Sequence, residues 1–380
     1  MLRLIWAEQQ LSRAEVSRKV GLSRSTVTGI VSDLIDQGLV FEARMARSRG
    51  GRPPILLQVR EDFRHLVGVE LGASHISAVV TDLRGRALRH AHRSVDVQGD
   101  PERAQQVLVE LILQLLQEQG LSPSDLAGVG LGVPCPLSSP DQLDPNILPA
   151  WSGHAPGARL VEALGVPVLM ENDANLGALA ELWWGAGQGV GDFSYIKVAT
   201  GVGAGHIIGG RVYRGGGGIA GEIGHTTIDI HGPPCRCGLN GCLEALVGRQ
   251  SLEQRTGMSL QQILDGAALR EPAALEAITE AGTALGIAVA NLLNLLNPAR
   301  VILGGTLTRA GDLLLEPMRL SLAQRALFTS VARSKVVLTT LGEDAVARGA
   351  ATLVLEAALQ DHTLLTNPSA SRRRRMEVPS

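Results

Sequence analysis

The chain has 380 residues, of which 45% are apolar and 3% aromatic, and its formal net charge is −2. This length exceeds one ordinary hydrophobic core, so we expect two or three folding units built on aliphatic side chains. Four cysteines are too few for a secreted scaffold held by disulfides. The sequence lacks both an apolar run of about 18 residues and a leader-like start, so we expect a cytoplasmic protein without a transmembrane helix.

The charge is distributed unevenly along the chain. Residues 1–60 contain ten Arg and Lys side chains against five acids, a formal charge of +5, which leaves −7 for the remainder. A basic end on an acidic chain is typical of a local nucleic-acid surface. Charge alone favours a merely solvated surface, so the interpretation depends on the helix and strand pattern of this segment.

The segment that follows Ser12 has the pattern of two short helices. Ser12 and Glu15 have the spacing of a capping box, Gly21 is suited to end the first helix, and Ser23 would begin a second that runs to about Gln37. The inner face of the second helix would carry Val27, Ile30, Val31, Leu34 and Ile35. Two such helices form a helix-turn-helix. The side chains that we expect to face the major groove are Ser23, Arg24, Ser25, Thr26 and Thr28.

A strand–tip–strand pattern follows the two helices. Residues 39–43 and 55–59 have strand character, and the segment between them is basic and rich in glycine. Arg49 and Arg52 flank glycines there, which would let them enter a minor groove. A solubilising hairpin is the alternative. We predict that the first 60 residues form a winged helix-turn-helix that binds double-stranded operator DNA.

The rest of the chain alternates strands and helices, which predicts a two-lobed α/β fold. We expect residues 63–173 to form the first lobe and 174–342 the second, with a helix at about 343–360 completing the first. The expected strands cover about 66–72, 76–82, 87–97, 129–133, 166–170, 193–198, 205–213 and 301–303, and the expected helices 101–119, 157–164, 174–185, 272–296 and 343–359. The Arg-rich tail, 366–380, is expected to be disordered, with a second DNA contact as the less favoured alternative.

One imidazole and three thiols form a candidate metal site. Cys235, Cys237 and Cys242 lie within eight residues, and His225 stands ten residues before the first of them. A His–Cys₃ set suits a closed, tetrahedral, structural Zn²⁺ site. The alternatives are unrelated thiols or a disulfide, although Cys235 and Cys237 are too close in sequence to bridge easily. Cys135 lies far from this cluster and is expected to be a small buried apolar residue.

Carboxylates and an amide lie near these candidate ligands or at a strand end. Glu222 precedes His225 by three residues and Glu244 follows Cys242 by two, so a metal-bound loop would hold both. Asn172 and Asp173 follow an expected strand, where the ligand crevice of an α/β sheet lies. Such donors and acceptors suit the hydroxyls of a sugar. For Asn172 and Asp173 alone, a helix N-cap is an equally good interpretation.

Two glycine-rich segments follow expected strands. These are residues 200–205 and 303–306. Their backbone N–H groups could bind phosphates, but glycines also serve tight hairpins, so this signal is weak.

With these motifs the sequence resembles the ROK family of repressors, open reading frames and sugar kinases, and its helix-turn-helix and wing resemble the xylose-repressor and N-acetylglucosamine-repressor branch. The resemblance rests on segments 51–53, 222–225 and 235–244 and covers nearly the whole chain except the tail. It implies an actin-like, ribonuclease-H-like, two-lobed fold, with structural zinc at His225, Cys235, Cys237 and Cys242. The sugar contacts that it implies are Asn172, Asp173, Glu222, His225, Glu244 and, with less support, Asn146.

In kinase members of that family the counterpart of Asp173 is the general base that activates a sugar hydroxyl. Those members carry an Asp-x-Gly-Gly-Thr phosphate loop, where this chain has Glu70-Leu71-Gly72-Ala73-Ser74. A longer carboxylate and an added Cβ argue against binding of Mg-ATP. We therefore expect a sensor in which Asp173 forms hydrogen bonds and no residue is catalytic.

The sequence as a whole predicts a sugar-responsive transcriptional regulator, most simply a repressor of sugar metabolism such as that of xylose, which binds its operator as a homodimer. It does not identify the sugar. The alternatives are an ATP-dependent ROK sugar kinase with a fused DNA-binding unit, and a constitutive DNA-binding protein that lacks a ligand.

Overall fold

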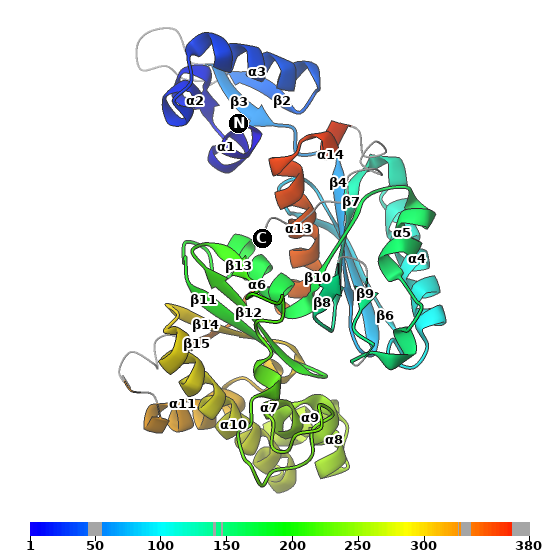
Figure 1. Ribbon diagram of the computed structural model, residues 1–380, viewed down its shortest axis with the longest axis vertical. Helices are drawn as coiled ribbons and strands as arrows, with labels where there is room; N and C mark the ends of the chain where they lie inside the picture. Colours follow the sequence, from blue (N-terminus) through cyan, green and yellow to red (C-terminus); the bar gives the residue numbers. More distant parts are fainter. Residues whose placement is uncertain (45–54, 140–141, 146, 326, 328–335, 367–380) are drawn as a thin grey trace.

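The computed structural model describes residues 1–44, 55–139, 142–145, 147–325, 327 and 336–366. Figure 1 shows a small N-terminal unit at one end of the molecule, followed along the long axis by two α/β lobes. Each lobe is built on one five-stranded sheet, and the N-terminal unit has a sheet of three strands.

The N-terminal unit contains the predicted helix-turn-helix. Its elements are α1 (Leu2–Glu8), β1 (Leu11–Ser12), α2 (Arg13–Val20), α3 (Arg24–Asp36), β2 (Val40–Arg44) and β3 (Ile55–Val59). Ser12 and Glu15 form the predicted capping box, and Gly21 ends α2 at a φ of 68°. The Ser23 side chain caps α3 by accepting a hydrogen bond from the Thr26 N–H. The strands β1, β3 and β2 form an antiparallel sheet beside the helices, as in a winged helix.

Two details of this unit differ from the sequence-based expectation. The helix α1 and the strand β1 were not predicted, because each is short and has little periodicity of its own. Ile30 was placed on the inner face of α3 but is 36% exposed. The buried stripe of α3 consists of Val27, Val31 and Leu34, and position 30 lies at the margin of that stripe, where no partner covers it fully.

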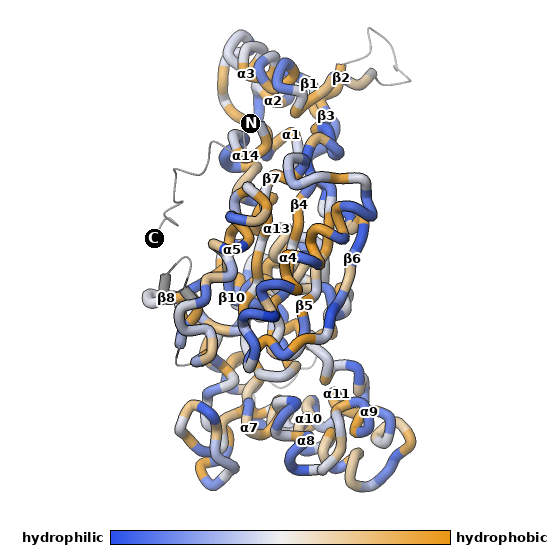
Figure 2. Tube along the Cα trace, turned by 90° about the vertical axis from the view of Figure 1, so that its right-hand side faces the viewer, coloured by the Kyte–Doolittle hydropathy of each residue, from blue (hydrophilic) through white to orange (hydrophobic). Residues whose placement is uncertain are grey.

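The first lobe has the strand order β10-β7-β4-β5-β6. Its strands are β4 (His65–Leu71), β5 (His75–Thr81), β6 (Ala87–Ser94), β7 (Leu126–Val133) and β10 (Val168–Asn172), with a small hairpin of β8 (Leu137–Ser139) and β9 (Gln142–Leu143). The first three strands are antiparallel, and β7 and β10 join β4 in parallel. The edge strand β6 is mostly exposed and hydrophilic (Figure 2), which protects the sheet edge from further pairing.

Helices cover both faces of this sheet. One face packs against α4 (Pro101–Glu118) and α5 (Pro156–Leu164), and the other against α13 (Ala345–Gln360), which returns from the C-terminal end. Gly68 and Gly130 allow α13 to approach, because a Cβ at either position would lie 1.9 Å from a backbone oxygen of that helix. Shorter elements of this part are η1 (Pro123–Asp125), η2 (Pro149–Trp151) and α14 (Thr363–Thr366).

The second lobe repeats the same strand order, as β13-β12-β11-β14-β15. Its strands are β11 (Phe193–Val198), β12 (Val202–Ile208), β13 (Arg211–Tyr213), β14 (Arg300–Gly304) and β15 (Val336–Leu338). Its helical elements are α6 (Asp173–Trp184), η3 (Ile223–His225), α7 (Leu243–Val247), α8 (Arg249–Thr256), α9 (Leu260–Ala268), α10 (Pro272–Leu296), η4 (Thr306–Ala310), α11 (Asp312–Arg325) and η5 (Gly342–Asp344). Two ribonuclease-H-like sheets after a winged helix confirm the predicted fold class.

The helices α6 and α13 join the two lobes. On one side α6 packs against β11 and β12 of the second sheet, and on the other it packs against α13, which covers the first sheet. Gly349 on α13 lies against the backbone oxygen of Leu176 on α6, so the two helices touch backbone to backbone at this point. Figure 1 shows this pair near the centre of the molecule. Any rotation of one lobe against the other must therefore move α6 and α13 relative to each other.

The helix α10 is the one helix of the described residues whose length and apolar composition would suit a membrane span. Here it is a core helix, because it packs against α11, α9 and one face of the second sheet, and thirteen of its residues are buried.

Candidate metal centre and ligand site

A loop of the second lobe brings one imidazole and three thiols together. The candidate ligand atoms of His225, Cys235, Cys237 and Cys242 all lie within 4.8 Å of one another. The loop closes through the hydrogen bond that the Cys235 N–H donates to the Leu239 oxygen and through the bridge that pairs residues 234 and 240. All four cysteines of the chain lie in its described part and are free thiols. The structure thus brings together the four residues that the sequence had grouped.

The spacing of these atoms fits a tetrahedral metal ion. The Sγ atoms of Cys237 and Cys242 are 3.6 Å apart, and the Cys235 Sγ lies 3.6 Å from the His225 Nδ1. Bond lengths of about 2.3 Å to sulfur and 2.0–2.1 Å to nitrogen give tetrahedral edges of about 3.8 Å and 3.6 Å. The donor set and the geometry therefore suit Zn²⁺.

The segment 222–244, which carries the four candidate ligands and is called the metal loop below, also holds Glu244, the second residue of α7. The guanidinium of Arg236 pairs with both oxygens of this carboxylate, with Nε 2.6 Å from Oε1 and Nη2 3.2 Å from Oε2. The Val202 N–H donates a further hydrogen bond of 3.0 Å to Oε2. Glu244 is only 8% exposed, so these three contacts satisfy a buried charge and fix its orientation.

Glu222 begins the turn η3 and lies 4.0 Å from the His225 imidazole. Burial raises the pKa of its carboxyl group; His225 opposes this shift, while the negative charges of Asp173 and Glu244 add to it. Geometry also links the metal loop to α6, because the Val202 N–H binds Glu244 and the next residue of β12, Gly203, packs against Ala174 of α6.

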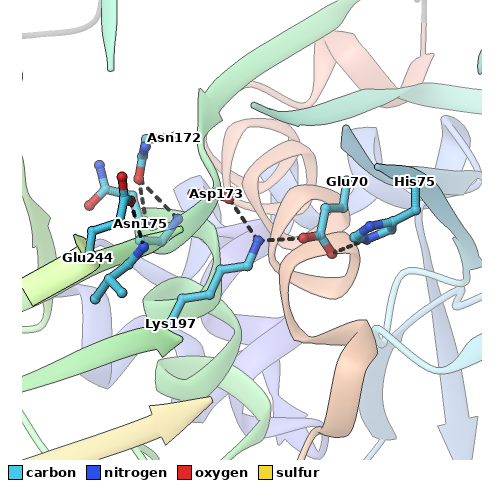
Figure 3. A network of polar contacts seen from close by, with 9 residues as sticks. Glu70, His75, Asn172, Asp173, Asn175, Lys197 and Glu244 are labelled. Carbon is cyan, nitrogen blue, oxygen red and sulfur yellow. Dashed lines mark hydrogen bonds and ion pairs between the residues drawn. The ribbon is translucent and has the colours of Figure 1, made fainter. Parts of the chain in front are cut away.

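Asn172 and Asp173 lie where β10 ends and α6 begins. The Asn172 Oδ1 accepts hydrogen bonds from the N–H groups of Ala174 and Asn175, at 3.0 and 3.2 Å (Figure 3). The helix-cap interpretation of Asn172 is thus correct. Capping orients the side chain and does not exclude a ligand contact, because the amide nitrogen is not used in the cap. Asp173 is the first residue of α6, and its carboxylate contacts a lysine of the second lobe.

That lysine is Lys197 on β11. It pairs with two carboxylates: that of Glu70 in the first lobe and that of Asp173, where the first lobe joins α6. Its Nζ donates to Asp173 Oδ2 at 2.7 Å and also to the buried Glu70 on β4 (Figure 3). Burial opposes the charge, but Asp173 and Glu70 raise the pKa of Lys197 above its ordinary value. Burial would also raise the pKa of Glu70, but Lys197 and His75 outweigh it and hold that pKa at about 2. In this triad of Lys197, Glu70 and Asp173, the lysine and Glu70 are therefore charged at neutral pH.

The glycine-rich segments have packing roles in this structure. A Cβ at Gly205 would lie 2.4 Å from the Ala174 oxygen, so this glycine lets β12 approach α6. Gly305 has a φ of 91° and lies against the Val198 backbone. These contacts support the interpretation that the glycines of both segments serve close packing. They give no support to the alternative that the segments bind phosphate.

The predicted DNA-contacting side chains of α3 are exposed. The exposed set consists of Ser23, Arg24, Ser25, Thr26 and Thr28. The Ser23 hydroxyl contacts those of Ser25 and Thr26, at 2.9 and 2.8 Å, which orders the start of this helix. Three other predicted contacts, Arg49 and Arg52 for DNA and Asn146 for sugar, lie outside the described residues.

Lys197 and Arg236 were missed by the sequence analysis. Lys197 could have been noticed, because the chain has only three lysines among its 35 basic residues and this one interrupts an apolar strand. A lysine in a buried strand needs a carboxylate partner. Arg236 lies between two candidate metal ligands, and no local signal shows that it reaches Glu244.

A winged helix-turn-helix joined to two ribonuclease-H-like lobes defines a class of protein, in which a DNA-binding unit is fused to an actin-like ligand-binding or kinase fold. The profile of the ROK family matches residues 66–357, and a winged helix-turn-helix DNA-binding profile matches residues 1–40. The chain belongs to the ROK family, and the resemblance stated from its motifs is confirmed.

Three relatives illustrate the range of the similarity. The chain is 32% identical to the xylose repressor of Bacillus subtilis (strain 168), with 94% of each protein covered. A solved ROK family transcriptional regulator, a homolog of the E. coli MLC protein, has a TM-score of 0.79 at 26% identity and 97% coverage of each chain. A ROK family glucokinase from Streptomyces griseus, solved with glucose and AMPPNP, has a TM-score of 0.68 at 27% identity, covering 76% of this chain and 98% of that one.

Proposed function

We propose that the protein is a sugar-responsive transcriptional repressor, which binds an operator through its winged helix and a monosaccharide between its lobes. The observation that carries this proposal is that Glu244 lies close to the start of α6, where Asp173 is. The Val202 N–H binds Glu244, and the next residue of β12, Gly203, packs against Ala174 of α6. Several carboxylates and an amide around one space, held by fixed partners, match the many hydroxyls of a sugar. Asn172, His225 and Asn146 complete the proposed set of sugar contacts.

In this proposal Zn²⁺ has a structural role. His225, Cys235, Cys237 and Cys242 would hold it, and the bound ion would supply the rigidity of the loop. A metal-bound His225 has a fixed ring orientation and tautomer, so the imidazole nitrogen that faces Glu222 is positioned before a sugar arrives. Arg236 and the Val202 N–H then keep Glu244 in place.

The DNA-binding part of the proposal places α3 in a major groove and the wing, with Arg49 and Arg52, at a minor groove. A homodimer would read an inverted-repeat operator in the bacterial cytoplasm, with one unit in each half-site. The full-length similarity to a protein named as a xylose repressor supports this assignment and makes D-xylose the first sugar to test.

A calorimetric titration of the zinc-loaded protein with D-xylose, D-glucose and N-acetylglucosamine tests the sugar site. We expect one of them to bind and to raise the melting temperature by mass action. Asp173→Asn should weaken that binding at least about tenfold, because a charge-assisted hydrogen bond contributes about 1.5–3 kcal/mol. Asp265→Asn, which changes an exposed carboxylate on α9, is the matched control and should bind normally. Absence of binding to this sugar panel would contradict the proposal.

A sugar kinase is the second candidate, favoured by the position of Asp173 at the start of α6 and by the similarity to a glucokinase. The contact between Lys197 and Asp173 argues against it, because the ammonium group already donates a hydrogen bond to Oδ2, an oxygen that a general base would use to accept a proton from the sugar. In the same sugar panel with Mg-ATP we therefore expect no release of ADP. Sugar-dependent release of ADP would establish the kinase alternative.

The DNA contact is tested at the start of α3. Arg24→Ala is expected to reduce operator affinity by about 1–3 kcal/mol for a base contact, or to lower the salt dependence by about one unit for a phosphate contact. Binding is measured by fluorescence anisotropy over a range of salt, with an inverted repeat selected from random duplexes. Arg159→Ala removes an exposed arginine of the first lobe and is the charge-matched control. Equal affinity and equal salt slope for the two variants would remove α3 from the interface.

A further inference from the structure

Three of the four tryptophans of the chain meet where the N-terminal unit contacts the lobes. Trp6 belongs to α1 of the DNA-binding unit, and Trp183 and Trp184 are the last two residues of α6. The ring centroid of Trp6 lies 5.1 Å from that of Trp183 and 6.2 Å from that of Trp184, and these two rings are 5.6 Å apart. An aromatic cluster with these distances forms a specific contact between two units.

Each indole N–H of this cluster donates a hydrogen bond to a residue of the lobes. Trp6 donates to the Leu83 oxygen of the first lobe at 2.6 Å. Trp184 and Trp183 both donate to α13, to the Thr352 hydroxyl at 2.7 Å and to the Glu356 carboxylate at 3.1 Å. The indole rings are therefore held in both position and orientation, and a shift of α6 cannot occur without disturbing them.

Further contacts fix Trp6 on the first lobe. The guanidinium of Arg84 lies 5.1 Å above the Trp6 ring, donates to the Trp6 backbone oxygen and pairs with Glu61 at 3.0 Å. Gly85 leaves space for the Trp184 ring, since a Cβ there would lie 2.4 Å from it. Side chains of α1, α2, α3 and α13 also share one hydrophobic cluster.

The DNA-binding unit therefore contacts both lobes. It contacts the first lobe through Leu83, Arg84 and α13, and it contacts α6, which packs on the sheet of the second lobe. A change in the angle between the lobes moves α6 relative to α13. Such a change must therefore alter the contacts of Trp6 with Trp183 and Trp184.

The other end of α6 lies at the proposed sugar site. Asn172 caps the helix, and Asp173 is its first residue and contacts Lys197 of the second lobe. The helix has twelve residues and a length of about 18 Å, and it ends at Trp184. A helix of this length, packed on two sides, moves as one body. One rigid element therefore joins the ligand site to the DNA-binding unit.

We infer that α6 transmits sugar binding to the DNA-binding unit, with Trp6, Trp183 and Trp184 acting as positioning residues for that coupling. The inference rests on the proposed function, since it requires a sugar that binds beside Asp173. A sugar held between the lobes would displace the start of α6 relative to the first lobe. The tryptophan contact would pass that displacement to α1 and so to the orientation of α3.

The test compares operator affinity with and without a saturating concentration of D-xylose, in the wild-type protein and in Trp6→Ala. Coupling between two sites usually amounts to about 5- to 150-fold in affinity. We expect the wild-type ratio to lie in this range and the ratio for Trp6→Ala to fall below about twofold. The variant should still bind D-xylose by calorimetry and operator by anisotropy, each within about threefold of wild type.

Val16→Ala is the matched control, because it removes buried volume on α2 of the DNA-binding unit and leaves all three tryptophans of the cluster in place. It should lower stability and retain the wild-type ratio. Wild-type coupling in Trp6→Ala would overturn the inference while leaving the proposed function intact. Absence of sugar binding to the wild-type protein would instead overturn the proposed function, and the inference with it.

Intrinsic fluorescence gives a second measurement that needs no DNA. Trp151→Phe removes the fourth tryptophan, which lies in the first lobe, so that the emission comes only from the cluster. With D-xylose binding verified by calorimetry in this variant, the sugar should shift its emission. An emission spectrum that D-xylose leaves unchanged would show that α6 does not move at the tryptophans and would overturn the inference.

Discussion

Replacing Cys237 with serine is expected to release zinc and to weaken sugar binding by about 10- to 100-fold, the usual effect of losing a group that orients a site. Cys237 is the exposed member of the cluster, so the substitution costs little core packing. Without the ion, His225 and the loop that carries Glu222 and Glu244 lose their common anchor. Sugar affinity should fall while operator affinity in the absence of sugar is retained.

Metal content by mass spectrometry and sugar affinity by calorimetry test this expectation. Cys135→Ala is the matched control, since Cys135 is a buried free thiol outside the cluster and should keep the wild-type metal content. A chelator should reproduce the effect of Cys237→Ser in the wild-type protein. Unchanged zinc in Cys237→Ser, or wild-type sugar affinity after complete removal of zinc, would refute the structural role of the metal.

Lys197→Met is expected to lower the free energy of unfolding by about 3–5 kcal/mol, because it leaves two carboxylates without the cation that they share. Glu70 and Asp173 are 4% and 14% exposed at their side chains, so water cannot replace the lysine. The double variant Lys197→Met with Glu70→Gln should be more stable than the single variant, since one buried charge is then removed. Urea denaturation measures both effects.

Lys19→Met is the matched control for this experiment. Lys19 is 48% exposed and pairs with Glu8 at the surface, where such pairs contribute at most about 1 kcal/mol. A loss in Lys197→Met no larger than in Lys19→Met would show that the interlobe triad does not stabilise the fold.

The pH dependence of stability should reverse in the same variant. In the wild-type protein the pKa of Glu70 is about 2 instead of 4.5, so its charge contributes about 3 kcal/mol above pH 4.5, and this contribution is lost as the pH falls toward 2. Without Lys197, burial should raise the pKa of Glu70 above 4.5. The variant should then gain stability, relative to wild type, on acidification from pH 7 to 5. The same change in the free energy of unfolding between pH 7 and 5 for wild type and Lys197→Met would contradict this account.

Features whose residues are neighbours in sequence were predictable. The capping box of Ser12 and Glu15 and the end of α2 at Gly21 follow from the geometry of a single helix. The cluster of His225, Cys235, Cys237 and Cys242 lies within one short segment, so thiol chemistry and spacing were enough to group it. The two sheets were expected as a fold class, since strands and helices alternate along most of the chain.

Features that depend on distant parts of the chain were not predictable. Lys197 pairs with Glu70 across 127 residues, and Trp6 meets Trp183 only because α1 and α6 pack on the same helix. The helices α7, α8, α9 and α11 and the strand β15 were missed as well. Their segments are short or weakly periodic, so packing against α10 and the second sheet, more than local preference, decides their structure.

The sequence by itself therefore determined the winged helix, the order of the two lobes and the grouping of four candidate metal ligands, because each depends on residues that lie close together along the chain. Only the tertiary structure decided which carboxylates share Lys197, where Glu244 is held, and that α6 reaches from Asp173 to Trp6. These contacts depend on how two sheets and the N-terminal unit pack around α6 and α13, and no local rule of spacing encodes that arrangement.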